Sequence, residues 1–99
     1  MKHPIQAFNK AFENRIRLGI MSALSVNDYV DFNSLKELLD VTDGNLAGHT
    51  RALEYLAYIQ MEKSFVGRKP NTRYSITLEG RAAFEKHLVA LEKIVKGDF

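Results

Sequence analysis

Two changes of hydrophobic periodicity between residues 42 and 77 constrain the fold of this chain more than any other feature. The segment "TDGNLAGHTRALEYLAYI" has one buried face at helical spacing, made of Leu46, Thr50, Leu53 and Ala57. The runs "YIQMEKSF" and "TRYSIT" then have strand composition, and the residues "GRKPN" between them are typical of a turn. A helix that leads directly into a β-hairpin is therefore predicted.

The segments before residue 42 predict two further helices. A regular four-residue spacing predicts an amphipathic helix, with Asn14 as a potential break, from Phe8, Phe12, Ile16, Ile20 and Leu24. "VNDYVDF" then breaks the helical pattern, and residues 29–31 are a candidate for a very short strand. Asn33 is the expected N-cap of a second helix, "SLKELLD". The buried side of that helix is expected to hold Leu35, Leu38 and Leu39.

Capping residues and a last apolar stripe complete the pattern. Thr42 or Asp43 can cap the helix before the hairpin, and an acid near a helix start suits the helix dipole. Thr77 can cap a final helix, whose apolar stripe is Phe84, Leu88, Leu91 and Val95. This order of elements predicts one α+β domain over residues 1–99, mostly helical. It consists of a helix-turn-helix, a small antiparallel hairpin that forms a wing, and a C-terminal helix.

The basic residues are concentrated in the middle third of the chain. The net charge is +2 overall, and by segment it is −1 for residues 1–43, +3 for residues 44–73 and 0 for residues 74–99. A local basic patch on a nearly neutral protein is the charge distribution expected of a surface that meets polyanions.

The outer face of the helix before the hairpin has an unusual composition. Solvent-exposed helix faces favour Glu, Lys and Gln, yet this face holds Gly44, Ala47, Gly48 and Arg51. Each interior glycine costs roughly 0.5–1 kcal/mol relative to alanine. Either the small residues let the backbone approach DNA, with Arg51 reaching a guanine edge or a phosphate, or they allow close packing against a neighbouring helix. The composition alone leaves both interpretations open.

The predicted hairpin tip, "VGRKPNTR", is uniformly basic. Arg68, Lys69 and Arg73 are charged donors for phosphates, and Gly67 and Pro70 shape the turn, so less entropy is lost on binding. The alternative is an ordinary solvated hairpin tip. A basic hairpin directly after a helix-turn-helix pattern is, however, much more specific than either part alone.

Five segments spread over nearly the whole chain carry a family resemblance: "RLGIMSAL", "DFNSLKELL", "VTDGNLAGHTRALEYLAYI", "KSFVGRKPNTRYSIT" and "EGRAAFEKHLVALEKI". Together they resemble the short winged-helix transcriptional regulators related to the MarR and ArsR families. The resemblance is greatest to the compact group with "TDGNLAxH" in the recognition helix and "GRKPNT" in the wing. It implies a bacterial or archaeal DNA-binding regulator, usually a homodimer that reads a pseudo-palindromic operator in double-stranded DNA.

The same resemblance, carried over by position, implies which residues contact DNA. In the recognition helix these are Asp43, Gly44, Asn45, Ala47, Gly48 and Arg51. In the wing they are Arg68, Lys69, Asn71 and Arg73. The "SxHL" of related recognition helices appears here as "AGHT", with Ala47 in place of serine and Thr50 in place of leucine. This change loses a hydroxyl that could bond a phosphate or a base.

Several classes of function are not expected. The chain has no cysteine, which excludes disulfides, thiolate zinc sites and cysteine nucleophiles. His3, His49 and His87 lie far apart, so no metal or other cofactor is predicted, and His49 is expected to pack at the helix-turn-helix junction with one ring nitrogen bonded. No glycine-rich phosphate loop follows a strand, and an enzyme is not predicted. No signal peptide or membrane span is expected, and the predicted location is the cytoplasm.

The two terminal apolar stripes are expected to leave apolar surface for a dimer interface. The predicted interface residues are Phe8, Phe12, Phe84, Leu88, Leu91 and Val95. The predicted function is sequence-specific binding of double-stranded DNA as a homodimeric transcriptional regulator, with repression as the default. The alternative is a winged-helix module that binds protein, with the basic wing on an acidic partner. The operator and any small-molecule effector are not predicted.

Overall fold

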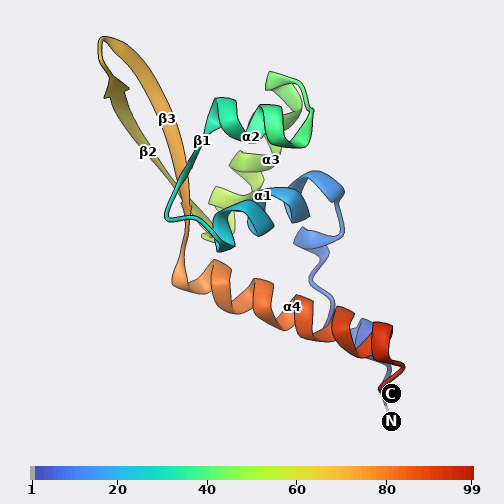
Figure 1. Ribbon diagram of the computed structural model, residues 1–99. Coiled ribbons are helices and arrows are strands. Elements are labelled where there is room, and N and C mark those ends of the chain that lie inside the picture. The colour runs from blue at the N-terminus through green and yellow to red at the C-terminus, as the bar shows by residue number, and fades with distance from the viewer. Residues whose placement is uncertain (1) are drawn as a thin grey trace.

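The computed structural model describes residues 2–99, which form four α-helices, two 3-10 turns and one three-stranded sheet (Figure 1). The elements in chain order are η1 (Pro4–Ala7), η2 (Lys10–Phe12), α1 (Arg15–Ser25), β1 (Val30–Asp31), α2 (Phe32–Leu39), α3 (Asp43–Tyr55), β2 (Ile59–Val66), β3 (Lys69–Ile76) and α4 (Leu78–Lys96). The predicted α+β class, mostly helical with a hairpin and a C-terminal helix, is confirmed.

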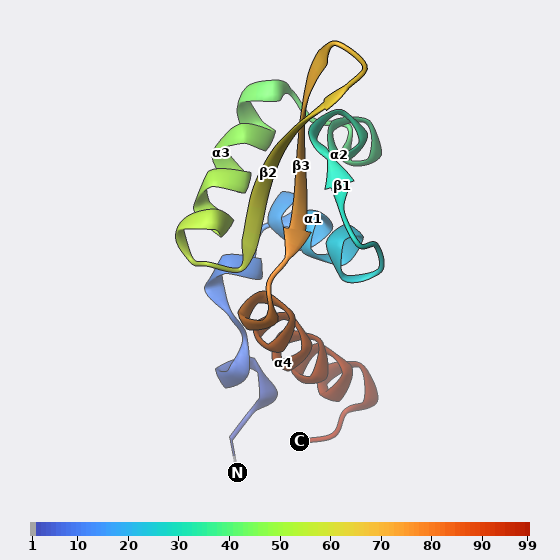
Figure 2. The ribbon, with the colours of Figure 1, turned by 90° about the vertical axis from the view of Figure 1, so that its left-hand side faces the viewer.

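The sheet is antiparallel, with β3 in the middle and β1 and β2 at its edges. The long hairpin of β2 and β3 extends beyond the helices as a wing (Figures 1 and 2). Its turn contains only Gly67 and Arg68, because Val66 pairs with Lys69, and Gly67 has a φ of +66° that favours glycine. The predicted five-residue turn "GRKPN" is therefore wrong, since Lys69, Pro70 and Asn71 belong to β3.

Pro70 fits this strand for a geometric reason. A two-residue turn is flanked by a hydrogen-bonded pair, so the next pair, Phe65 and Pro70, is non-hydrogen-bonded. Pro70 has no N–H, and an N–H at this position would point away from β2. It would face the edge of β3 that pairs with β1 only at Tyr74 and Arg73. The proline therefore leaves the ladder between β2 and β3 intact.

The N-terminal segment differs from the predicted helix, which was expected to include Phe8 and Phe12 and to have a potential break at Asn14. Phe8 lies between the two 3-10 turns, Phe12 ends the second, and α1 begins only at Arg15. Two asparagine side chains explain the breaks, since Asn9 caps η2 and Asn14 caps α1 by accepting the N–H groups of Ile16 and Arg17. The predicted break at Asn14 is thus confirmed.

The helix-turn-helix is formed by α2 and α3. Asp31, rather than the predicted Asn33, caps α2, with its carboxylate 2.8 Å from the N–H of Ser34. The short strand β1 confirms the one predicted near residues 29–31. Leu35 of α2 is buried, but Leu38 is 66% exposed and was wrongly predicted to be buried. Thr42, one of the two predicted caps, caps α3 by accepting the N–H of Asn45.

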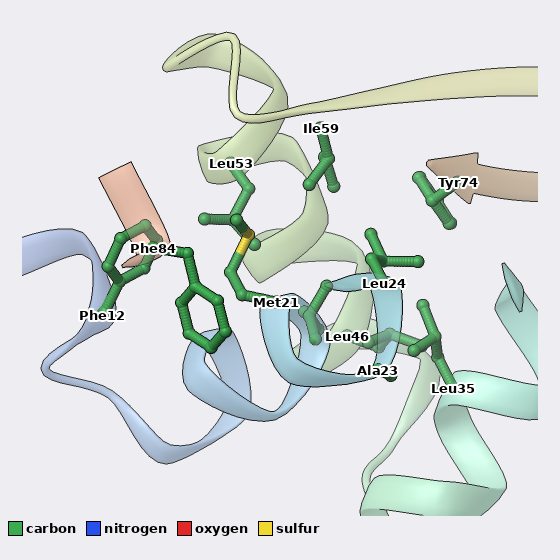
Figure 3. Packing of buried hydrophobic residues seen from close by; sticks show 11 residues of the cluster. Phe12, Met21, Ala23, Leu24, Leu35, Leu46, Leu53, Ile59, Tyr74 and Phe84 are labelled. Carbon is green, nitrogen blue, oxygen red and sulfur yellow. The ribbon is translucent and has the colours of Figure 1, made fainter. Parts of the chain in front are cut away.

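The hydrophobic core lies where α1 crosses α3 beneath the sheet (Figure 3). Leu46 and Leu53 of α3 point into this core, and Thr50 between them is also buried. Ala57 was predicted on the same face, but it lies beyond the end of α3, is exposed and has a φ of 61°. The core continues into Ile59 and Tyr74 of the sheet, so α3 and the wing are fixed relative to each other.

Helix α4 begins against the core and then projects from it, at the end of the molecule opposite the wing (Figures 1 and 2). The molecule is therefore elongated, with extents of 57 × 25 × 21 Å. Thr77 caps α4 as predicted. An added Cβ at Gly80 would lie 2.0 Å from the carbonyl oxygen of Tyr58, so the first turn of α4 rests directly on that backbone. Within residues 2–99, no helix is long and apolar enough to cross a bilayer.

Candidate nucleic-acid interface

The outer face of α3 is open along the positions of its two glycines. An added Cβ at Gly44 or Gly48 would meet no atom within 4 Å, and both residues are exposed. The glycines therefore do not serve to pack α3 against another helix of the same chain. Of the two interpretations that the sequence left open, close packing within the chain is the one that the structure contradicts.

The first turn of α3 carries two of the predicted contact residues, Asp43 and Asn45, and both are exposed. The carboxylate of Asp43 is 2.9 Å from the Nζ of Lys36 in α2. This hydrogen bond raises the pKa of Lys36, and the pairing places a cation beside the one acidic group of this turn. Lys36 was not among the predicted contact residues.

A groove separates the middle of α3 from the hairpin. Ala47, Arg51 and Glu54 line its helical side, and Met61, Thr72 and Tyr74 line its strand side. Arg51 is exposed at the mouth of the groove. Ala47 is half-buried at its wall, so its methyl group faces the hairpin as well as solvent.

The unusual "AGHT" segment has a structural basis. The hydroxyl of Thr50 donates a hydrogen bond to the carbonyl oxygen of Ala47 at 3.1 Å, and Thr50 is buried. Thr50 therefore faces the core, where related recognition helices have leucine, and takes no part in the exposed face.

His49 links α3 to α1. The prediction that one of its ring nitrogens is bonded is confirmed, but the bond lies at the contact of α3 with α1 and not at the turn between α2 and α3. Its Nδ1 is 3.0 Å from Nη1 of Arg17, whose Nε also donates to the carbonyl oxygen of Ala11. Since a guanidinium can only donate, His49 accepts this bond as a neutral ring. Burial, followed by the positive charge of Arg17, lowers the pKa of His49.

The predicted contact residues of the wing lie partly at its tip and partly nearer its base. Arg68 and Lys69 are exposed at the tip. Asn71 is half-buried in a cleft that the wing forms with the start of α2, near Asn33 and Glu37. The cations that protrude furthest along the hairpin are therefore Arg68 and Lys69.

Arg73 lies at the base of the wing and has partners within the chain. Both its Nε and its Nη2 bond Oε1 of Glu62, the first at 2.8 Å, and its guanidinium lies 4.1 Å from the ring centroid of Tyr29. These contacts tie β3 to β2 and to the loop before β1, and Arg73 is less available to phosphates than a tip residue. The correct two-residue turn would have placed Arg73 opposite Glu62, but the predicted longer turn hid this pair.

The predicted dimer residues are not equally exposed. Phe12 and Phe84 are 2% and 4% exposed and meet edge to face in the core of the protomer, which corrects their assignment to an interface. Phe8 is half-buried against His87, and Leu91 is also half-buried. Leu88 and Val95 are exposed on α4, where Val89 is a further exposed apolar residue that was not predicted.

A metal site was not predicted, and among residues 2–99 no group of three or more His, Asp or Glu side chains could hold a metal ion. Two carboxylates near the interface have partners of other kinds, since Glu62 bonds Arg73 and Asp31 caps α2.

Comparisons with known proteins agree with this geometry. Residues 16–95 match the model of the winged helix DNA-binding domain. An uncharacterized protein of Methanocaldococcus jannaschii is 34% identical over 87 residues, which cover 88% of this chain and 95% of that protein.

Solved structures are also similar. A transcriptional regulator homologue from Pyrococcus horikoshii OT3 superposes with a TM-score of 0.88 at 30% identity, covering all of both chains. The YusO protein from Bacillus subtilis shares the fold, with a TM-score of 0.80 at 18% identity over 95% of this chain and 66% of that one. The predicted resemblance to winged-helix regulators is confirmed, and the chain belongs to the winged helix DNA-binding domain family.

Proposed function

We propose that the protein is a homodimeric transcriptional regulator that binds a specific sequence in double-stranded DNA, with repression by occlusion of polymerase as its mode of action. Membership of a DNA-binding family supports double-stranded DNA as the partner. The Pyrococcus horikoshii protein, which is described as a transcriptional regulator homologue, supports the regulatory role.

The open glycine face of α3 is the observation that carries this proposal. An α-helix enters the major groove most closely where its side chains are small, and Gly44 and Gly48 have free space in front of them. Arg51, one turn after Ala47 on the exposed side, then reaches base edges or phosphates. Asp43 and Asn45 lie in the first turn of α3. The N-terminal turn of a recognition helix is the part that contacts base edges.

The wing is proposed to hold the DNA backbone beside that groove. Arg68 and Lys69 supply charge for phosphates at its tip, and Asn71 offers an amide nearby. Arg73 contributes more to holding the hairpin than to the contact itself, because Glu62 and Tyr29 already engage it. The wing therefore contributes affinity, and α3 contributes the choice of sequence.

The dimer is proposed to form through the projecting helix α4 and the N-terminal segment beside it. Leu88 and Val95 are exposed there, and Val95 is 85% exposed. A two-fold pair would place its two reading helices about 34 Å apart, one turn of DNA. Leu88→Glu with Val95→Glu should give a folded monomer with weakened DNA binding, and a wild-type monomer at tens of micromolar in sedimentation would contradict the dimer.

The test of the function is selection of bound sites from random duplexes, followed by salt titrations on the recovered site and on mixed sequence. We expect a pseudo-palindromic site and an affinity that falls steeply with salt. Absence of any salt-dependent binding to duplex DNA would contradict the proposal and favour a protein partner for the basic wing.

A further inference from the structure

The tip of the wing carries exposed apolar side chains among its cations. Phe65 is 72% exposed, and its cross-strand partner is Pro70, which is also exposed. Side chains of a non-hydrogen-bonded antiparallel pair lie close together on the same face. An aromatic ring and a proline therefore form a small apolar surface at the end of the hairpin, where solvation alone would favour polar residues.

The face on which this pair lies connects it to α3. Because side chains alternate along a strand, Phe65 shares its face with Met61, and Pro70 shares its face with Thr72 and Tyr74. Met61, Thr72 and Tyr74 line the groove beside Arg51. A ligand that lies along α3 and is contacted by Arg51 would therefore meet the Phe65–Pro70 pair further along the same side of the hairpin.

The charges around the pair indicate the chemistry of that ligand. Lys63 lies two residues before Phe65 on the same face, and Arg68 and Lys69 form the turn and the start of β3. Glu62, the one carboxylate of the hairpin, is bonded to Arg73 at its base. An apolar surface with Lys63 on its own face and Arg68 and Lys69 at the adjacent tip fits a polyanion with apolar walls. The deoxyribose rings and base edges of the minor groove have this character.

We propose that Phe65, backed by Pro70, is an apolar DNA contact that packs against the wall of the minor groove while Lys63, Arg68 and Lys69 hold the flanking phosphates. This inference rests on the proposed DNA-binding function and adds a contact that charge alone does not provide. Apolar contacts release no counterions, so this part of the affinity is independent of salt.

The experiment compares salt titrations of wild type, Phe65→Ala and Phe65→Lys on the selected duplex and on a mixed-sequence duplex of equal length. Phe65→Ala should weaken binding at every salt concentration by roughly tenfold for each wing of the proposed dimer, since burial of a phenylalanine side chain accounts for at least that factor. Its slope of log affinity against log salt should equal that of wild type. Val26→Ala removes another exposed apolar side chain, at the C-cap of α1, and is the control that should bind like wild type.

Phe65→Lys distinguishes an apolar contact of the wing tip with DNA from a contact made by its charges alone. It adds a cation and removes the ring, so we expect weaker binding than wild type at high salt, where phosphate contacts contribute least. Wild-type affinity for Phe65→Ala, or tighter binding by Phe65→Lys at every salt concentration, would overturn the apolar contact while leaving the proposed function intact. Failure of the wild-type protein to bind either duplex would overturn both.

Discussion

The glycines within helices occur in two opposite settings, packed against other parts of the chain in α1 and α4 and open on the outer face of α3. At Gly80, an added Cβ would lie 2.0 Å from the backbone oxygen of Tyr58, and at Gly19 it would lie 2.5 Å from Leu39. At Gly44 and Gly48, it would meet nothing within 4 Å. The first pair of glycines is explained by packing within the chain, and the second is not.

This difference separates residues that build the fold from residues that are available to a partner. An interior helical glycine costs roughly 0.5–1 kcal/mol relative to alanine, and at Gly80 the close contact between α4 and the hairpin start offsets that cost. At Gly48 no contact in the described chain does so. The comparison therefore predicts that substitutions at the two sites change different quantities, stability at one and binding at the other.

The largest effect is expected from Gly80→Ala. The new methyl group would meet the carbonyl oxygen of Tyr58, which also accepts the N–H of Thr77. Moving α4 to relieve this contact should cost about 3 kcal/mol of the free energy of unfolding, as for overpacking in a core. Urea denaturation measures the loss, and unchanged stability would mean that the contact is easily relieved. Protein that remains folded should bind DNA normally.

Arg51→Ala tests the other side of the comparison. Arg51 is exposed on the open face of α3, so its removal should leave the free energy of unfolding nearly unchanged. Binding to the selected site should weaken by about 1–3 kcal/mol, and binding to mixed sequence by less. Equal losses on the two duplexes would show that Arg51 contacts phosphate and does not choose sequence.

Lys69→Ala should lower the salt dependence of binding. Each phosphate contact contributes about 0.9 to the slope of log affinity against log salt, so one contact in each protomer of a dimer predicts a slope reduced by about 2. The loss should be similar on selected and mixed sequence. Arg73→Ala is the contrasting variant, because Arg73 bonds Glu62 and its removal should affect the slope less. An unchanged slope for Lys69→Ala would place Lys69 in solvent.

Two buried or half-buried histidines predict a loss of stability in acid. His87 accepts the N–H of Asn9 at Nδ1, and burial lowers its pKa, as it does that of His49. In acid the unfolded chain therefore binds more protons than the folded chain. The contribution of the two neutral histidines to the free energy of unfolding is complete above pH 6.5, and it decreases as the pH falls toward the folded pKa values. The fall is at most about 1.4 kcal/mol per pH unit for each histidine. His87→Gln should flatten this dependence in urea denaturation between pH 7 and 5, and a wild-type slope in this variant would contradict the assignment.

The sequence predicted most of the local structure because local signals specify it. Thr42, Thr77 and the alternation of the two long strands define the elements that they cap or form. The errors arose where two local signals competed. The spacing of Phe8 and Phe12 suggested a helix, but the side chain of Asn9 interrupts it. Asp31 and Asn33 are both good caps for α2, and composition does not decide between them.

The candidate site was less predictable, because its partners come from distant segments. The role of Arg73 in holding β3 to β2 and to the loop before β1 became clear only when the hairpin register placed it opposite Glu62 and near Tyr29. The pair of Lys36 and Asp43 spans the turn between two helices. The glycines of α3 were predictable as unusual, but whether they faced a neighbouring helix or open space depended on the tertiary structure.

Gly48→Ala tests the central claim most directly when stability and DNA affinity are measured on the same protein. The account predicts a gain of about 0.5–1 kcal/mol in the free energy of unfolding, because alanine favours the helix and meets no neighbour. It also predicts a clear loss of affinity for the selected duplex, because the methyl group stands where the DNA must approach. Ala82→Gly, at an exposed position of α4, is the reverse control and should lose stability with unchanged binding. A Gly48→Ala protein that is stabilised and binds DNA as tightly as wild type would contradict the account.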